Sequence, residues 1–578
     1  MYHRFDRRIA MTLAAAALAA CATTSTPTSG TPTTGASSTM AAITAADLRH
    51  RVYIYADDSM AGRKAGTPGN DKATQYIADE LRRMGMQPGG ENGTYFQRVP
   101  MLNLIASRTK PIIVDGKNFM PAKDYIGRTP KTFNNVQAIY GGVFGEPSML
   151  VPEQATGKVV VLSVPKDAAG KPRWSGTRQP STGRFRTAHS VAIVGFDGMT
   201  PADWMPLMEE GYPFLDDPSQ PAIDFSDMFG PVGFLYVSGA MGDAMMGGSL
   251  ASMAPGTLGR YIGGGMGFDT TRTAGRNVIG IIPGSDPALR GQFVAIGAHN
   301  DHVGMSPVKE EHDSLKAFNI VARPWGADST APREMTPART AEFNRVLDSL
   351  RRAHNNARKI DSVFNGADDD ASGSMSVLEI AEAFQKASTR PKRSLIFVWH
   401  TAEELGLYGS QYFTDHPTIP RDSIVAQLNM DMVGRGGPGN LVGRTKEGAD
   451  IWGSPDYVQL VGSRRLSTEL GNLVEEVNTR QAKPLKFDYS IDANGHPQYI
   501  YCRSDHYSYA RYGIPITFFT TGGHADYHQL TDEPQYIEYD HMQRIAQLVH
   551  DAAARVANLD HRIIVDKPKP DPKGQCVQ

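Results

Sequence analysis

The chain has 578 residues, of which 40% are hydrophobic and 21% are charged. This composition is ordinary for a soluble globular protein and excludes collagen-like, wholly disordered and polytopic membrane classes. The 59 Lys and Arg residues nearly balance the 61 Asp and Glu residues, so the chain has no basic surface for nucleic acid. Its three cysteines, Cys21, Cys502 and Cys576, are too few for a disulfide scaffold or a cysteine-based zinc site. Any metal ligands must therefore be His, Asp and Glu.

The first residues have the pattern of an export signal. A basic segment precedes an apolar run, Ile9 to Ala20. This run is too short to span a bilayer as a stable helix. Residues 1–20 are therefore predicted to form a signal peptide.

The end of this segment, Leu18 to Cys21, resembles the bacterial lipobox. The resemblance implies that the signal is cleaved and that Cys21 becomes a lipidated first residue, which anchors the chain to a membrane. Ala22 at the next position implies sorting to the outer membrane, facing the periplasm. An ordinary signal peptide with an Ala-x-Ala cleavage site is the alternative. Export would allow Cys502 and Cys576 to pair, and the sequence leaves that pairing open.

Shifts in composition divide the rest of the chain. Residues 21–44 are rich in Thr, Ser, Pro and Gly and are predicted to be a disordered tether. The Pro- and Lys-rich residues 563–578 are predicted to be a poorly ordered tail. Residues 135–270 carry short β-like runs between Gly- and Pro-rich connections, which predicts an inserted β-rich domain. Residues 45–134 and 271–562 then form the two parts of one larger domain.

The larger domain alternates between helical and strand-like patterns. Apolar residues recur on one helical face between residues 71 and 84, and Gly85 ends the helix. Short apolar runs are separated by helical stretches such as Met375 to Ala387, which predicts an α/β fold with a mostly parallel sheet and helices on both faces. The runs are Phe293 to Ile296, Leu395 to Val398, Ile424 to Leu428 and Ile516 to Phe519.

Each of these runs leads into polar residues. The ligand crevice of an open α/β sheet lies beyond the carboxyl ends of its strands, so these side chains are expected to converge. In chain order they are His299 and Asp301, then Glu403 and Glu404, then Asp431, and finally His528.

An acidic cluster, Asp368 to Asp370, precedes the helix that is predicted to begin near Ser372. Taken singly, a loop histidine is usually structural, and the cluster could be a helix cap with solvated charges. Several carboxylates crowded together without a cation would raise one another's pKa, which a fold does not normally accept. Two histidines and three carboxylates around one crevice suit two divalent cations with one bridging carboxylate. The sequence therefore predicts a two-metal site.

The motifs at these positions resemble one family. They are similar to the co-catalytic di-zinc aminopeptidases of peptidase clan MH, which are related to glutamate carboxypeptidase and transferrin receptor. GRKAGTPG and the helix after it resemble that family's N-terminal segment, and the inserted segment resembles a protease-associated domain. The matching blocks are GAHND, GADDDASG, HTAEELGLYGS, LNMDMVG and YH at 527–528.

The resemblance implies a metal ligand set and two Zn²⁺ ions. Asp368 would bridge the two ions. His299 and Asp431 would complete one site, and Glu404 and His528 would complete the other. Cobalt or manganese could replace zinc at ligands of this kind.

The resemblance also implies catalytic roles. Glu403 matches the general base, which takes a proton from the attacking water and delivers it to the leaving amine. Asp301 would hydrogen-bond the imidazole of His299 and fix its tautomer. Tyr501 matches a phenol that steadies the tetrahedral oxyanion, against the alternative of a buried aromatic residue. Asp505 and His506 match a motif near the site, and no catalytic step is assigned to them.

One departure concerns the connection between Asp301 and Asp368, which is far longer than the family needs. An insertion near 305–364 contains a charged, helical segment around Thr340 to Ile360. Such an insertion could be a lid, a wall of the substrate site or a dimer contact. The HExxH motif of other zinc peptidases is absent, which excludes that class.

The leading hypothesis is a metal-dependent exopeptidase, an aminopeptidase that hydrolyses N-terminal residues from peptides. A glutaminyl-cyclase-like enzyme shares the fold, but it uses one zinc. A carboxypeptidase for acidic C-termini would need a basic pocket, which the sequence does not locate. A non-enzymatic peptide-binding or receptor-like protein is the least favoured alternative, because receptor relatives lose ligands and this chain keeps them all. Side-chain preference and oligomeric state are not predicted.

Overall fold

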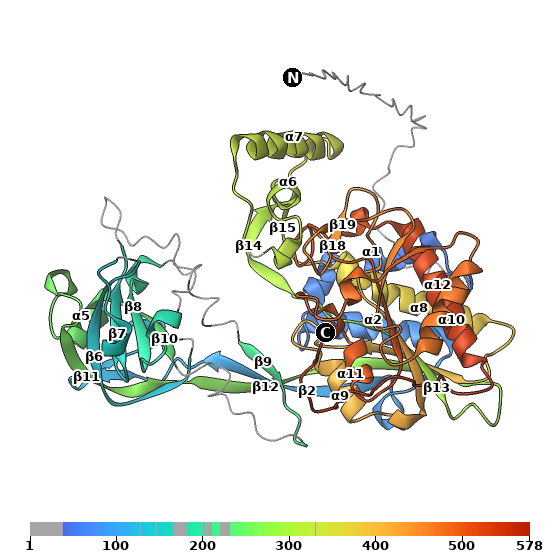
Figure 1. Ribbon diagram of the computed structural model, residues 1–578, viewed down its shortest axis with the longest axis horizontal. Coiled ribbons are helices and arrows are strands. Elements are labelled where there is room, and N and C mark those ends of the chain that lie inside the picture. Colours follow the sequence, from blue (N-terminus) through green and yellow to red (C-terminus); the bar gives the residue numbers. More distant parts are fainter. Residues whose placement is uncertain are drawn as a thin grey trace, which may run out of the picture. The chain divides into compact units, whose positions relative to one another are not determined.

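Figure 1 presents the computed structural model of the chain. It describes residues 39–578, with gaps at 128, 146, 166–181, 200–203, 205–207, 209–210, 220–231 and 330. The predicted signal peptide, Cys21 and most of the tether therefore lie outside the described residues. Within the described part, no helix is long and apolar enough to cross a membrane.

A 10-stranded sheet forms the centre of the larger domain. Its strand order is β21-β20-β22-β17-β13-β16-β12-β2-β9, and β1 pairs with β12 outside this path. The strands are β1 (Gln87–Pro88), β2 (Phe96–Ala106), β9 (Tyr212–Leu215), β12 (Phe268–Ile282), β13 (Phe293–His299), β16 (Ser394–His400), β17 (Ile424–Met430), β20 (Tyr457–Val461), β21 (Lys486–Asp488) and β22 (Ile516–Thr520).

The four strands β22, β17, β13 and β16 are parallel to one another and contain the four predicted apolar runs. Strands β16 and β17 are buried along their whole length, as expected for parallel strands that are covered on both faces. The outer pairs of β12 with β16 and of β2 with β12 are antiparallel. The predicted α/β class is confirmed, and the parallel arrangement applies to the strands that carry the predicted site.

Helices cover both faces of this sheet (Figure 1). Alternate strand side chains point to opposite cores, so that Leu395 and Phe397 join one core and Ile396 and Val398 join the other. The first core also receives α1 (Ala45–Tyr55), α2 (Pro68–Met84), α8 (Gly373–Lys386), α10 (Thr468–Thr479) and α12 (Tyr539–Ala557). The second core receives α9 (Tyr408–Asp415) and α11 (His506–Ala510).

Helix α2 contains the segment predicted at 71–84. Pro68 stands in its first turn, where a missing N–H costs no hydrogen bond. Gly85 ends the helix in the left-handed conformation with φ of 73°, which glycine adopts without strain. The predicted helix and its end are therefore confirmed.

A second, 8-stranded sheet lies in the predicted inserted segment, in the order β4-β3-β11-β6-β7-β8-β10-β5. The predicted start at residue 135 is wrong, because it falls inside β6 and the sheet already begins at β3. The segment also returns strand β9 to the first sheet, where it pairs with β2. The strands of the second sheet are β3 (Ile112–Val114), β4 (Lys117–Phe119), β5 (Tyr125–Gly127), β6 (Lys131–Val143), β7 (Val159–Ser163), β8 (Ser190–Val194), β10 (Gly233–Val237) and β11 (Leu258–Met266).

The predicted insertion near 305–364 is a small unit of its own secondary structure. Strands β14 (Met305–Glu311) and β15 (Ile360–Val363) pair with each other, and α6 (His312–Ala322) and α7 (Pro337–Ala353) lie between them in sequence. Helix α7 is the predicted charged helix. A short 3₁₀ turn at Gly326–Asp328 follows α6.

The predicted disorder of the tail does not hold for its last residues. Cys576 forms a disulfide with Cys502, and the side chain of Gln578 is 4% exposed. The cross-link explains the difference, because a polar composition does not reveal a covalent bond to the folded domain. The disulfide also settles the pairing that the sequence left open.

Candidate metal centre

The candidate site lies at the carboxyl ends of the four parallel strands. His299 is the last residue of β13, and Asp431 directly follows β17. Glu403 and Glu404 follow β16 in a turn that leads to α9, and His528 lies in the loop after β22. The expectation that these side chains converge is confirmed by two groups of potential metal ligands, which share Asp369.

The first group consists of His299, Asp369 and Asp431. His299 Nε2 lies 3.1 Å from Asp369 Oδ1 and 3.6 Å from Asp431 Oδ1. Ser504 Oγ donates a hydrogen bond of 2.7 Å to Asp431 Oδ2, which leaves Oδ1 directed to the imidazole. One imidazole nitrogen and two carboxylate oxygens thus face the same point.

The second group consists of His302, Asp369, Glu404 and His528. His528 Nε2 lies 2.9 Å from Asp369 Oδ2 and 2.8 Å from Glu404 Oε2. His302 Nδ1 lies 2.6 Å from Glu404 Oε1. The two oxygens of Asp369 therefore face different groups.

The prediction that Asp368 stands between the two groups is wrong, because Asp369 has that place. Asp368 Oδ1 accepts hydrogen bonds from the Gly434 N–H at 2.6 Å and from Ser372 Oγ at 3.0 Å. Its Oδ2 lies 3.0 Å from His524 Nε2. Asp368 thus ties the start of α8 to the loop after β17.

Asp370 has a similar structural task. Its carboxylate accepts hydrogen bonds from the N–H groups of His299 at 3.1 Å, Gly373 at 2.8 Å and Met432 at 3.2 Å. These bonds join the end of β13, the start of α8 and the loop after β17. Of the three consecutive aspartates, two hold the backbone in place and one is free to act as a ligand.

Asp301 contacts the imidazole of the first group, and its backbone carbonyl, not its carboxylate, lies within hydrogen-bond distance. His299 Nδ1 lies 3.1 Å from the carbonyl oxygen of Asp301 and 3.7 Å from its Oδ1. Asp301 Oδ1 also accepts a hydrogen bond of 3.1 Å from the Glu403 N–H. One buried residue thus fixes both the imidazole of His299 and the start of the turn that carries Glu403.

His302 is a site residue that the sequence reasoning missed. It is 1% exposed, and its ring holds one oxygen of Glu404 while His528 approaches the other. The signal was present, since His302 directly follows Asp301. The GAHND block ends at Asp301, so the family resemblance does not include His302.

Glu403 lines a pocket together with Asp369, Glu404, Asp431 and His528. Burial raises the pKa of the Glu403 carboxyl well above its ordinary value, and the nearby carboxylates of Asp431 and Glu404 act in the same direction. His299 partly offsets this effect. Glu403 lies beside both ligand groups without belonging to either, which is the position that a general base for an attacking water requires.

Tyr501 is not among the described residues that line this pocket. Its ring packs in the second core of the 10-stranded sheet. The Arg465 guanidinium lies 4.3 Å from the ring centroid. The described contacts do not connect Tyr501 with either ligand group, so the structure supports the buried-aromatic alternative. Asp505 lies close behind the site, with Oδ2 3.3 Å from His400 Nδ1.

The ligand atoms fit divalent cations. The Nε2 atoms of His299 and His528 are buried and make no hydrogen bond, although carboxylate oxygens surround both. Burial would lower the pKa of His299, but Glu403 and Asp431 raise it well above its ordinary value. The site therefore attracts positive charge, and imidazole with carboxylate is a donor set that suits zinc.

The insertion contributes a wall of the same pocket. Trp325, which precedes its 3₁₀ turn, and Asp328, which ends the turn, line the pocket with Arg503 and Tyr527. Arg503 pairs with Asp328 at 2.9 and 3.2 Å and donates a hydrogen bond of 3.1 Å to the Tyr527 hydroxyl. Of the roles considered for the insertion, the contacts support that of a substrate-site wall.

These observations define an α/β protein of the zinc-exopeptidase fold, with two groups of side chains that could hold metal ions. The sequence profile of Peptidase family M28 matches residues 277–553. That segment, which contains every ligand named above, is similar to this family. The match bears out the predicted resemblance to the zinc peptidases.

Known relatives match parts of the chain. Leupeptin-inactivating enzyme 1 of Streptomyces exfoliatus is 44% identical over 86 residues, which are 14% of this chain and 20% of that protein. Leucine aminopeptidase 1 of Penicillium rubens is 28% identical over 235 residues, which are 39% of this chain and 55% of that protein. The chain thus spans about half the length, or less, of these relatives. A solved zinc aminopeptidase from Bacillus subtilis has 15% identity and a TM-score of 0.44, over 89% of this chain and 95% of its own.

Proposed function

We propose that this protein is a metal-dependent aminopeptidase that hydrolyses N-terminal residues from peptides. The observation that carries the proposal is the place of Asp369, whose two oxygens face two separate groups of ligand atoms. Glu403 lies in the same pocket without belonging to either group. This arrangement is suited to hydrolysis by an activated water molecule.

Two Zn²⁺ ions would be held by the two groups. His299, Asp369 and Asp431 would hold one ion, and Asp369, Glu404 and His528 the other, with His302 orienting Glu404. Bound ions of this kind supply a Lewis acid and lower the pKa of water.

Glu403 performs the proton transfers of the proposed reaction. Its carboxylate takes a proton from the attacking water as the oxygen bonds to the peptide carbonyl carbon. It then gives this proton to the leaving nitrogen as the carbon–nitrogen bond breaks. Asp301 fixes the position of the turn that contains Glu403, because its carboxylate accepts a hydrogen bond from the Glu403 N–H.

The pocket favours a free amine over a free carboxylate because its described lining holds no uncompensated cation. The zinc ions held by Asp369, Glu404 and Asp431 would offset the charge of these carboxylates, so that charge does not enter the comparison. Arg503 is the one Arg or Lys among the described lining residues, and Asp328 already neutralises it. A carboxypeptidase would need an uncompensated cation here.

The first test compares aminoacyl-arylamides with their N-acetylated counterparts, using a soluble form that lacks residues 1–40. We expect cleavage of the free-amine substrates alone, its loss after treatment with a chelator, and its return when zinc is added. Cleavage of peptides from the carboxyl end, or cyclisation of N-terminal glutamine, would instead support the corresponding alternative.

We also propose that the chain is an exported lipoprotein, anchored through Cys21 to the outer membrane and facing the periplasm. The Cys502–Cys576 disulfide supports export, because disulfides persist in oxidising compartments. We expect metabolic labelling with palmitate to mark the wild-type protein and not Cys21→Ala, and the wild type to sediment with outer membranes. Equal labelling of both proteins would refute lipidation at Cys21.

A further inference from the structure

One wall of the pocket comes from a segment with little regular structure. After β21, residues 489–503 contain two short 3₁₀ turns, Ser490–Asp492 and Ile500–Cys502. A wall of this kind depends on contacts from outside the segment to keep its shape. Its pocket-lining residues are Ile491, Gln498, Ile500 and Arg503.

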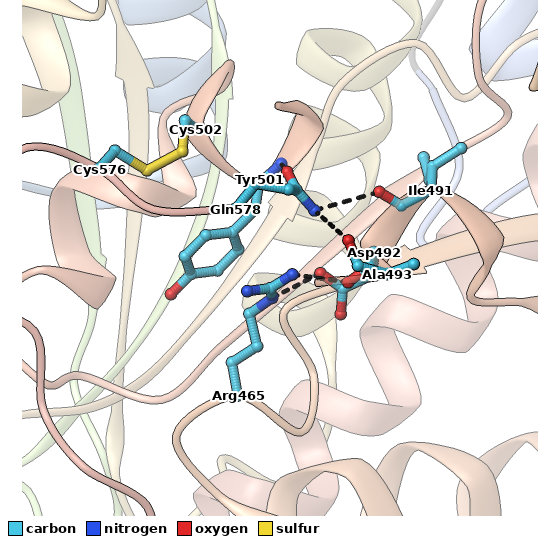
Figure 2. Close-up of a disulfide and its surroundings, with 8 residues drawn as sticks. All are labelled: Arg465, Ile491, Asp492, Ala493, Tyr501, Cys502, Cys576 and Gln578. Atoms are coloured by element: carbon cyan, nitrogen blue, oxygen red, sulfur yellow. Dashed lines mark hydrogen bonds and ion pairs between the residues drawn. A yellow bond between two sulfur atoms is a disulfide. The ribbon is translucent and has the colours of Figure 1, made fainter. Parts of the chain in front are cut away.

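Gln578 supplies such contacts from behind the wall (Figure 2). Its Oε1 accepts a hydrogen bond of 2.8 Å from the Tyr501 N–H, and its Nε2 donates to the carbonyls of Ile491 at 3.3 Å and Ala493 at 3.2 Å. Its backbone carbonyl accepts from the Gly495 N–H at 2.9 Å. One buried residue therefore satisfies backbone groups at four positions of the wall.

The disulfide holds Gln578 in this place. Cys576, two residues earlier, is bonded to Cys502, which directly follows Tyr501 (Figure 2). The bond joins residues 74 apart in sequence, so it fixes residues 576–578 to the wall. Val577, between the two contacts, is 76% exposed and takes no part in them.

The wall also has an attachment that does not involve these residues. Arg465 Nε lies 2.7 Å from Asp492 Oδ1, and Arg465 Nη2 donates to the Asp492 carbonyl at 2.6 Å. Figure 2 shows Arg465 and Gln578 reaching this segment at separate points. Loss of Gln578 should therefore loosen the wall without unfolding the domain.

From these contacts we infer that residues 576–578 form a strap that positions the substrate-binding wall of the pocket, with Gln578 as its positioning residue. The strap sets how well substrate is bound, whereas the ligand groups and Glu403 remain in place without it. This inference rests on the proposed function, since the wall matters to catalysis only if the pocket binds substrate.

The test uses Gln578→Ala and Cys576→Ser, with Val577→Ala as the matched control in the same strap. For a cleaved aminoacyl-arylamide, we expect KM to rise about fivefold or more in the first two variants, because buried backbone groups lose their partners. The kcat should stay within about twofold and the zinc content should be unchanged, since no ligand is altered. Amide hydrogen exchange of residues 489–503 should become faster. Val577→Ala should match the wild type in every measurement.

Several results would overturn the inference. If Gln578→Ala lowers the melting temperature and leaves KM unchanged, residues 576–578 stabilise the fold but do not position the wall. If hydrogen exchange at 489–503 is unchanged, the strap does not hold the wall in place. Gln578→Met, which keeps the side-chain length without its hydrogen bonds, gives the same test if Gln578→Ala does not fold. If the wild type cleaves no substrate, the proposed function fails, and the exchange rates still decide whether the strap holds the wall.

Discussion

Glu403→Gln should lower kcat by about 10²- to 10⁴-fold, the usual contribution of a general acid–base residue. The amide keeps the size of the side chain but cannot accept the proton of the attacking water. Because Glu403 belongs to neither ligand group, both metal ions should remain bound. Steady-state kinetics and metal analysis on the same preparation check the two parts of this expectation.

The adjacent residue provides the matched control. Glu404 belongs to the second ligand group, so Glu404→Gln should lose metal as well as activity. Addition of excess zinc should partly restore Glu404→Gln and leave Glu403→Gln inactive. Full activity in Glu403→Gln, or metal loss equal to that of Glu404→Gln, would remove the assigned role of Glu403.

The strands that carry the site could be predicted because each one is recognisable from its own short stretch of sequence. Each central strand is a short apolar run, and the residue that follows it must lie at the carboxyl edge of a parallel sheet. His299 and Asp431 are placed by this rule, whereas His528 lies further along the loop that follows β22. The antiparallel outer strands, such as β9 and β12, belong to long-range pairings that have no comparable local pattern.

The inserted domain illustrates the same limit. Its first strands, β3 and β4, are only three residues each and pair with distant or neighbouring strands whose positions the sequence does not give. The change of composition near residue 135 therefore marks the start of the domain later than its first strands do. Likewise, Gln578 is ordered because of a disulfide and hydrogen bonds to distant backbone groups. The polar composition of the tail does not predict these contacts.

The direction of a side chain is the hardest part of the site to predict. Tyr501 stands next to site residues in sequence, but its ring packs against Arg465 in the core. Asp368, Asp369 and Asp370 have the same chemistry, and only the backbone geometry of the turn decides which one faces the two imidazoles. Sequence reasoning can therefore predict a bridging aspartate in this cluster without identifying it.

The difference between Asp368 and Asp369 can be measured with a matched pair of substitutions. Asp369→Asn removes the charge shared by the two ligand groups and offers one amide oxygen in place of two carboxylate oxygens. We expect this variant to lose most of its bound metal from both groups and to lower kcat/KM by about 10³-fold or more.

Asp368→Asn should behave differently, because its amide oxygen can still accept the hydrogen bonds of the Gly434 N–H and Ser372 Oγ. Its amide nitrogen would face His524 Nε2, which donates to the present Oδ2 because His524 Nδ1 accepts from the Asp526 N–H, so this one hydrogen bond is lost. We expect both ions to remain, kcat/KM to stay within about tenfold of the wild type, and stability to fall by about 1–3 kcal/mol. Metal titration and thermal unfolding of the two variants give the comparison. Metal loss in Asp368→Asn with retention in Asp369→Asn would reverse the assignment, since only the residue between the two groups is needed by both.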